Sequence, residues 1–296
     1  MQMQSVEKVM LDELTAWRVR GPRGELLVTA QGAQVLEYRE YDRPPLIWLS
    51  DQARMREGQS VRGGIPVCWP WFGDLARNPE AVSAQYQGSD APAHGLVRGL
   101  DWQLAEIESL GESVELRFVC DTTHLPGWSP APELELRVCL DERLHLTLTN
   151  RNRSERTLTI SQALHSYFAV SDVRKVSLEG FAGLEYIETL EDWARHHQRG
   201  EPAIEGETDR IYLQTPDRLA ILDPIWERRI VLESQGSRST VLWNPWVAKA
   251  QRLSQFAADA WKDMLCIETA NILEDVVELA PGAEHQLKLS LYSQPL

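Results

Sequence analysis

Hydrophobic and polar residues alternate along much of this 296-residue chain. In three successive segments, apolar side chains occupy every second position: Val114, Leu116 and Phe118; Leu134, Leu136, Val138 and Leu140; and Leu144, Leu146 and Leu148. Because neighbouring side chains of a strand point to opposite faces of its sheet, this period of two predicts strands with one buried face. Residues 141–143, between the last two segments, predict a tight hairpin turn.

Comparable segments recur to the end of the chain. Residues 230–234 and 240–243 flank a second turn, SQGSR, and apolar residues alternate again over 287–291. Antiparallel strands with one polar face, separated by turn residues, predict an all-β fold, a large antiparallel β-sandwich with a few short helices. Although the length alone would allow two domains, no linker divides the chain, and we expect a single domain spanning residues 1–296.

Three segments depart from simple alternation, and a fourth follows it. Residues 74–93 and 191–208 are rich in polar and turn-forming residues and predict long loops, which are often functional in compact domains. Residues 244–264 predict helix, in two short pieces. Residues 158–170 predict a strand in which His165 lies on the face opposite the apolar side chains.

The segment 61–73, VRGGIPVCWPWFG, holds two glycines and two prolines, which exclude a helix and disfavour a central strand. It predicts a rigid, irregular loop in which flat aromatic rings lie beside Arg62. Such a loop suits a small ligand with an apolar face and an anionic end, such as a sugar phosphate. A buried loop whose tryptophans simply fill the core fits the same residues equally well.

The net charge of −14 disfavours nucleic acid and anionic membrane as partners. The same charge repels an anionic ligand, so local arginines would have to overcome it. One charge pair at ~4 Å is worth about 4 kcal/mol at an effective dielectric constant of ~20, so two adjacent arginines could do so.

The location of the protein is predicted from what the chain lacks. No apolar run approaches the ~20 residues that a membrane span requires, and the N-terminal segment has no apolar stretch typical of a secretion signal. The four cysteines are far apart in the sequence, lie among apolar residues and form no CxxC pair. These features predict reduced, buried thiols in a cytoplasmic protein, with no zinc finger.

Two residues carry a catalytic signal of their own. Glu268 lies in an apolar run, where burial of a carboxylate costs several kcal/mol unless it is paired or functional. Such surroundings raise the pKa of a glutamate toward values suited to proton transfer, which favours a catalytic role. His165 fits an accessible functional histidine and a satisfied core histidine about equally. By contrast, His94, Arg98 and Asp209 alone fit ordinary turn or surface roles.

Six segments together resemble the glucose-6-phosphate 1-epimerases, a branch of the aldose 1-epimerase (galactose mutarotase-like) superfamily. They occur in the order of that family and cover most of the chain. The segments are RGGIPVCWPWFG at 62–73, HGLVRGLDW at 94–102, LHSYFAV at 164–170, TDRIY at 208–212, VLWNPWVAKA at 241–250 and KDMLCIETAN at 262–271.

The resemblance implies an isomerase that interconverts the α and β anomers of a hexose 6-phosphate, most simply D-glucose 6-phosphate, without a metal or other cofactor. It implies a site on the concave face of the sandwich, with His165 as the general acid at the ring oxygen and Glu268 as the general base at the anomeric hydroxyl. The substrate-binding residues that it implies are Arg62 and Arg98 for the phosphate, Asp209 for sugar hydroxyls and His94 beside the ring oxygen.

The sequence departs from the family pattern in one segment. Ala93 stands where some members carry glutamine, and HGLVRGL replaces the commoner HGFAR. The first change removes one expected hydrogen bond to the substrate, so the preferred sugar stays open.

Two other functions remain alternatives. A non-catalytic carbohydrate-binding protein on the same sandwich would keep the aromatic residues and arginines but would have little need for both His165 and Glu268. Alternatively, His94 could join these two residues as ligands of a divalent metal. We rank the epimerase first, and expect a monomer that binds a sugar phosphate and neither nucleic acid nor membrane.

Overall fold

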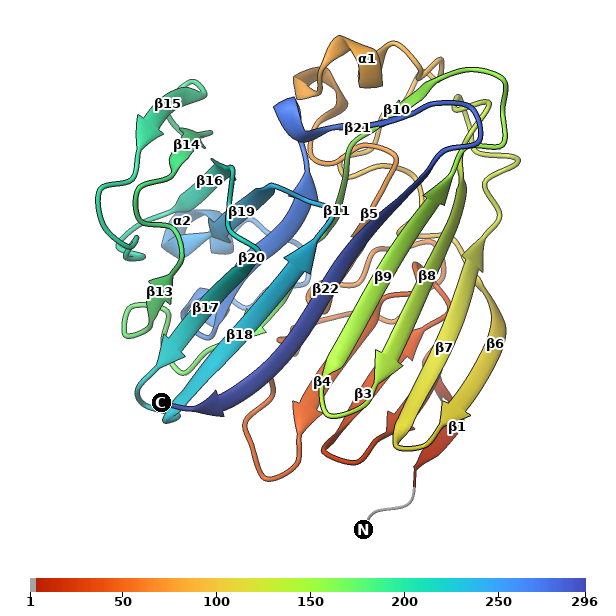
Figure 1. Cartoon of the computed structure of the whole chain (residues 1–296). Coiled ribbons are helices and arrows are strands. Elements are labelled where there is room, and N and C mark those ends of the chain that lie inside the picture. The colour runs from red at the N-terminus through yellow and green to blue at the C-terminus, as the bar shows by residue number, and fades with distance from the viewer. Residues whose placement is uncertain (1–3) are drawn as a thin grey trace.

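The computed structural model describes residues 4–296 and consists mainly of two large antiparallel sheets packed face to face (Figure 1). We call the first one the outer sheet. In spatial order it contains β13 (Ser177–Glu179), β17 (Arg218–Asp223), β18 (Arg228–Gln235), β22 (Glu284–Pro295), β9 (Leu144–Arg151), β8 (Glu133–Leu140), β7 (Ser113–Cys120) and β6 (Gln103–Leu110). The C-terminal strand β22, blue in Figure 1, runs through its middle between β18 and β9.

We call the second one the site sheet, because it carries the functional residues described below. In spatial order it contains β15 (Ala194–His197), β14 (Glu185–Glu188), β16 (Thr208–Leu213), β19 (Ser239–Asn244), β20 (Met264–Asn271), β11 (Gln162–Leu164) and β5 (Val67–Cys68), with β12 (Tyr167–Ala169) also paired to β20.

Smaller elements complete the fold. A four-stranded sheet near the N-terminus contains β1 (Ser5–Leu11), β2 (Leu14–Arg20), β3 (Gly24–Thr29) and β4 (Val35–Glu40). A two-stranded sheet pairs β10 (Leu158–Ile160) with β21 (Val277–Leu279). The helices are all short: α1 (Glu80–Ser83), α2 (Trp246–Ala250) and the 3-10 turns η1 (Leu75–Arg77), η2 (Ala260–Lys262) and η3 (Leu273–Asp275). Within residues 4–296, no helix has the length and apolar character needed to cross a bilayer.

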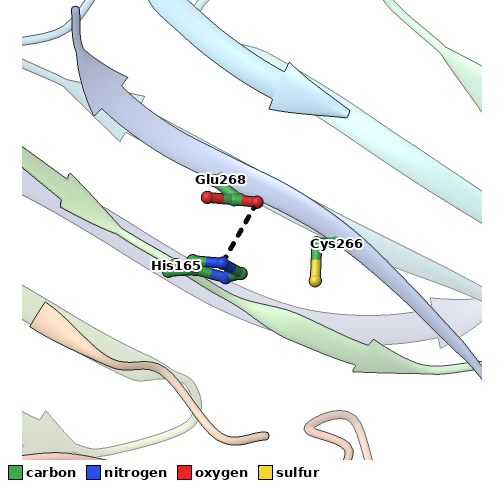
Figure 2. A group of neighbouring side chains, drawn as sticks. All are labelled: His165, Cys266 and Glu268. Atoms are coloured by element: carbon green, nitrogen blue, oxygen red, sulfur yellow. Dashed lines mark ion pairs between the residues drawn. The ribbon is translucent and has the colours of Figure 1, made fainter. Parts of the chain in front are cut away.

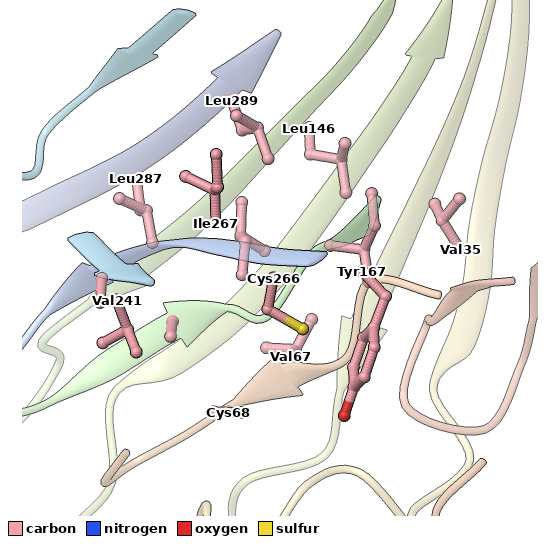
Figure 3. Packing of buried hydrophobic residues seen from close by; sticks show 14 of the residues in the cluster. Val35, Val67, Cys68, Leu146, Tyr167, Val241, Cys266, Ile267, Leu287 and Leu289 are labelled. Atoms are coloured by element: carbon pink, nitrogen blue, oxygen red, sulfur yellow. The ribbon is translucent and has the colours of Figure 1, made fainter. Parts of the chain in front are cut away.

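The core lies between the two large sheets and is filled by the alternating apolar positions. Leu146, Leu287 and Leu289 of the outer sheet meet Ile267 of the site sheet there, and all four are fully buried (Figure 3). Cys266, the neighbour of Ile267 on β20, projects to the opposite face of the site sheet in the same view. The alternation of β20 thus directs one set of side chains to the core and the other set to the functional face.

The predicted antiparallel sandwich and its hairpin at residues 141–143 are confirmed, because β8 and β9 pair in register across that turn. The segments flanking SQGSR are also strands, β18 and β19, but they belong to different sheets, so this turn carries the chain from the outer sheet to the site sheet. The helix prediction for residues 244–264 is confirmed as two short pieces, α2 and η2.

Two other predictions need correction. Residues 191–208 are not entirely loop, because 194–197 form β15 at the edge of the site sheet, and residues 74–93 include η1 and α1. Residues 158–170 do not form one strand but three short ones, β10, β11 and β12, the first of which belongs to another sheet. The pairing with β20 is interrupted at His165, where Ser166 N–H donates to Leu164 O (3.0 Å) in a tight turn. His165 N–H donates to Pro66 O (3.0 Å), which continues the pairing of β11 with β5.

The two short strands β11 and β12 nevertheless share one register against β20. Leu164 pairs with Thr269 before the break, and Tyr167 pairs with Cys266 after it. Continuing the same register across the break places His165 directly opposite Glu268.

A chain of buried amides holds β11 in this register. Asn150 on β9 accepts a hydrogen bond from Trp69 Nε1 (2.7 Å) and donates to Gln162 Oε1 (2.8 Å). Gln162 in turn donates to Asn271 Oδ1 (2.9 Å), its cross-strand neighbour on β20. Because buried polar groups must be bonded to one another, this chain favours one alignment of the two strands over a slipped one.

We therefore predict that Gln162→Leu destabilises the fold. Leucine has a similar volume but leaves Asn150 Nδ2 and Asn271 Oδ1 without this partner, at about 1–3 kcal/mol for each buried group. Denaturant unfolding should show a loss of about 2–6 kcal/mol, whereas Gln103→Leu on the exposed edge strand β6 should change stability by about 0.5 kcal/mol or less. Equal stability of the two variants would contradict the proposed role of the amide chain.

Candidate active site

A cavity of about 630 Å³ lies on the face of the site sheet opposite the core. Two adjacent rows of cross-strand neighbours lie beneath it. The first row is Ile211, Val241, Glu268 and His165, and the second is Asp209, Trp243, Cys266 and Tyr167. Seven of these eight side chains line the cavity, the exception being Cys266, whose side chain is fully covered.

His165 and Glu268 meet at one end of the first row (Figure 2). His165 Nε2 lies 3.5 Å from Glu268 Oε1, and the two side chains are 10% and 2% exposed. The remaining polar atoms, His165 Nδ1 and Glu268 Oε2, are buried and bond to no group of residues 4–296. Buried polar atoms without partners are costly, so these two atoms are suited to bind a ligand that enters the cavity.

Burial shifts the pKa values of the two groups in opposite directions. Removal from water raises the pKa of Glu268 well above its usual value, and the nearby Asp209 carboxylate adds to this. Removal from water also lowers the pKa of His165 well below 6.5, and His94, Arg98 and Arg62 lower it further. Both groups thus favour their neutral forms, which gives the pair one proton in total, on the carboxyl.

Arg62 contacts the catalytic candidates through Tyr167. Its Nη1 donates to the hydroxyl of Tyr167 (3.2 Å), whose ring stacks on that of His165 with centroids 4.7 Å apart and planes 8° from parallel. Arg62 otherwise donates only a long hydrogen bond to Ser254 O (3.4 Å), and none of the carboxylates of residues 4–296 lies within 4.0 Å of it. Arg62 is therefore free to pair with an anion in the cavity.

Arg98 and His94 reach the cavity from a single tight turn. Arg98 donates to Ala93 O (2.7 Å) and, like Arg62, forms no ion pair within the described chain. His94 Nδ1 accepts a hydrogen bond from Gly73 N–H (3.4 Å), and burial together with the two arginines lowers its pKa to about 3. The turn needs Gly95, since its φ is +81° and a Cβ there would lie 2.0 Å from Trp69 O.

Asp209 lies at the other end of the second row and has a cationic partner. Its carboxylate is 3.6 Å from Lys249 Nζ, which also contacts Glu207 (3.2 Å). Burial raises the pKa of Asp209, and the ammonium of Lys249 opposes that shift. The Asp209 carboxylate can therefore accept hydrogen bonds from hydroxyl groups of a ligand while keeping this ion pair.

One group of side chains could also hold a metal ion. The ligand atoms of His165, Cys266 and Glu268 lie within 4.8 Å of one another. However, burial raises the pKa of the Cys266 thiol well above 9, and metal binding requires the thiolate. A metal there would have to displace protons that burial favours on both the Cys266 thiol and the Glu268 carboxyl, and His94 of the alternative metal set is not part of this group.

The chain as a whole is also similar to known proteins. The sequence profile described as "Aldose 1-epimerase" matches residues 16–292. This chain belongs to the aldose 1-epimerase family.

Individual members of the aldose 1-epimerase family match over most of the chain. A protein of Escherichia coli K12 described as "Putative glucose-6-phosphate 1-epimerase" is 31% identical over 88% of this chain and 84% of its own length. A protein of Cenchrus ciliaris with the same description is 29% identical over 89% of this chain and 80% of its own length. The crystal structure of a "putative mutarotase (YeaD)" from Salmonella typhimurium superposes with a TM-score of 0.86 at 24% identity, covering 98% of this chain and 94% of that one, which supports the shared fold.

All six residues that the family resemblance singles out line the one cavity: Arg62, His94, Arg98, His165, Asp209 and Glu268. The aromatic loop at 61–73 only partly follows expectation. Gly63 and Gly64 adopt positive φ values, and Arg62 and Phe72 line the cavity. Trp69 and Trp71, however, are fully buried core residues, so the reading in which the tryptophans of this loop fill the core is correct.

Other aromatic and basic side chains line the cavity in their place, and sequence reasoning missed them. They are Arg77, Trp193, Trp243 and Lys249. Each lies in one of the two long polar segments or in one of the family motifs. Nothing in the sequence distinguished these residues from their neighbours. The cysteine prediction holds for three thiols, which are free and buried, while Cys139 is free but only partly buried.

Proposed function

We propose that this chain interconverts the α and β anomers of a hexose 6-phosphate, with D-glucose 6-phosphate as the substrate, by opening and reclosing the sugar ring. The observation that carries the proposal is the contact between His165 and Glu268 in a cavity that also holds the two arginines without ion-pair partners. The descriptions of the relatives from Escherichia coli and Cenchrus ciliaris support the same substrate.

Ring opening requires two proton transfers on opposite sides of the bond between C1 and O5. Glu268 removes the proton of the anomeric hydroxyl while His165 gives a proton to the ring oxygen, and the bond between C1 and O5 breaks to give the aldehyde. After rotation about the bond between C1 and C2, His165 takes the proton back from O5 and Glu268 returns one to O1. Each such transfer typically contributes about 10²–10⁴-fold to the rate.

The pair holds one proton throughout this cycle and alternates between two forms. Ring opening starts from imidazolium and carboxylate, and ring closure starts from imidazole and carboxylic acid. The burial-driven pKa shifts favour the second form in the absence of substrate. Because Arg62 and Arg98 help to lower the pKa of His165, a bound phosphate would offset their charge and favour the first form.

The remaining cavity residues have supporting roles in this proposal. Arg62 and Arg98 bind the phosphate, for which guanidinium groups supply charge and paired donors. The carboxylate of Asp209 accepts hydrogen bonds from sugar hydroxyls. Since Nδ1 of the neutral His94 ring accepts a hydrogen bond, its proton is on Nε2, which can donate to the ring-oxygen side of the sugar.

A non-catalytic carbohydrate-binding protein is not favoured, because binding alone gives no reason to bury an imidazole against a carboxyl. Each of these groups pays a desolvation cost and leaves one atom unbonded. As further parts of the proposal, the chain is a cytoplasmic monomer without a nucleic-acid partner. Its free cysteines support the cytoplasmic location, and its net charge of −14 disfavours nucleic acid.

We predict that His165→Ala and Glu268→Gln each slow anomer exchange by at least about 100-fold, because each removes one proton-transfer group. Proton exchange NMR spectroscopy of glucose 6-phosphate reports this exchange at equilibrium. His145→Ala, on the outer sheet and away from the cavity, is the matched control and should exchange at the wild-type rate. Thermal unfolding checks that the variants are folded, and unchanged exchange in both variants would contradict the proposed pair.

We also predict that combined Arg62→Gln and Arg98→Gln substitutions separate phosphorylated from neutral sugars. Loss of two charge-assisted hydrogen bonds of about 1.5 kcal/mol or more each should raise KM for glucose 6-phosphate roughly 100-fold. The KM for glucose should stay nearly unchanged, as should both constants in Arg218→Gln, which removes an exposed arginine from β17. An equal rise for both sugars would show that the arginines do not recognise the phosphate.

A further inference from the structure

The two long polar segments predicted from the sequence, 74–93 and 191–208, come together at the cavity. Arg77 is the last residue of η1 in the first segment, and Trp193 lies in the turn between β14 and β15 in the second. The guanidinium carbon of Arg77 lies 5.3 Å from the centroid of the Trp193 ring, and both side chains line the cavity. Neither residue takes part in the proton transfers proposed above.

Arg77 is an exposed cation without an acidic partner. None of the carboxylates of residues 4–296 lies within 4.0 Å of its guanidinium, whereas Arg195 and Arg210 on neighbouring strands are both ion-paired. Asp74, three residues earlier, instead uses its carboxylate to accept a hydrogen bond from Ala76 N–H (3.0 Å). Arg77 therefore adds a third uncompensated positive charge to a cavity that already contains Arg62 and Arg98.

The turn that carries Trp193 adopts a conformation that is costly for residues with a Cβ. Asp192 and Trp193 both have positive φ values, +50° and +60°, in succession. Such backbone conformations persist where the surroundings hold them, and they cluster at ligand sites. Here the result is a half-buried indole at the cavity, in contact with the guanidinium of Arg77.

We propose that Arg77 and Trp193 form a substrate clasp, in which the indole packs against the C–H face of the hexose and the guanidinium contacts the phosphate. The proposal rests on the function proposed above and assigns two specificity-determining residues to it. A hexose ring presents apolar C–H faces that pack well on aromatic rings, and a guanidinium can stack on an indole while its N–H groups bind an anion. The clasp thus recognises the sugar and its phosphate together.

The test compares two probes, glucose 6-phosphate and inorganic phosphate, by titration calorimetry. Trp193→Ala should weaken binding of glucose 6-phosphate about tenfold and leave that of inorganic phosphate within about twofold, because only the sugar ester has a ring to pack on the indole. Trp193→Phe, which keeps an aromatic ring and guards against a folding defect, should recover most of the lost affinity. Arg77→Gln should weaken both probes about threefold or more, since it removes a charge that both use.

A matched control is available outside the cavity. Trp226 also lies under an arginine, Arg228, at 4.7 Å, and Trp226→Phe should bind both probes as the wild type does. Unchanged affinity for glucose 6-phosphate in both Trp193→Ala and Arg77→Gln, with normal anomer exchange in the wild type, would overturn the clasp alone. Equal weakening of both probes by Trp193→Ala would also overturn it, whereas a wild type without anomer exchange would overturn the proposed function itself.

Discussion

The candidate site depends on the register between β20 and the two short strands β11 and β12. That register places His165 opposite Glu268, and a buried chain of amides through Asn150 and Gln162 fixes it from the core side. A shift by one residue would exchange the two faces of β20 and turn Glu268 into the apolar core. The structural core and the proposed chemistry are therefore held by the same strand pairing.

The charged residues that line the site contrast with the overall negative charge of the protein. The chain carries a net charge of −14, yet Arg62, Arg77 and Arg98 line one cavity without ion pairs to the described residues. A salt-screened, diffuse negative charge weakens over about 8–10 Å, whereas these guanidinium groups act at contact distance. A small anion can thus bind in the cavity despite the overall charge, and its own charge would change the proton balance of the pair beneath it.

Much of the fold could be predicted because strands and turns are specified by residues close together in the sequence. Alternating leucines and valines define the strands β7, β8 and β9. A three-residue turn joins β8 and β9 in a hairpin. The sequence could not show that β18 and β19 join different sheets, since that depends on packing between distant strands. It also predicted one strand over 158–170, because the placement of β10 in another sheet depends on its pairing with β21, far along the chain.

The candidate site was partly predictable, because some of its residues are unusual within their own segment of the sequence. Three residues stand out before the family is considered: Glu268 in an apolar run, Arg62 beside the aromatic loop and His165 on a polar strand face. The family motifs supplied the other three, His94, Arg98 and Asp209. Trp193 and Arg77 did not stand out, because an aromatic or basic residue in a polar loop is ordinary until its spatial neighbours are known. The tryptophans that did stand out, Trp69 and Trp71, are core residues.

The most direct test of a pair that shares one proton is the pH dependence of kcat/KM for anomer exchange, which reports ionisations of the free protein. When the pH falls below the lowered pKa of His165, the pair gains a second proton and activity is lost. When the pH rises above the raised pKa of Glu268, the pair loses its only proton and activity is lost again. After correction for the phosphate ionisation near pH ~6, we predict a bell-shaped profile with its acid limb well below pH 6.5. A profile whose acid limb follows an ordinary histidine at about 6.5, or one that is flat on both sides, would contradict the shared proton.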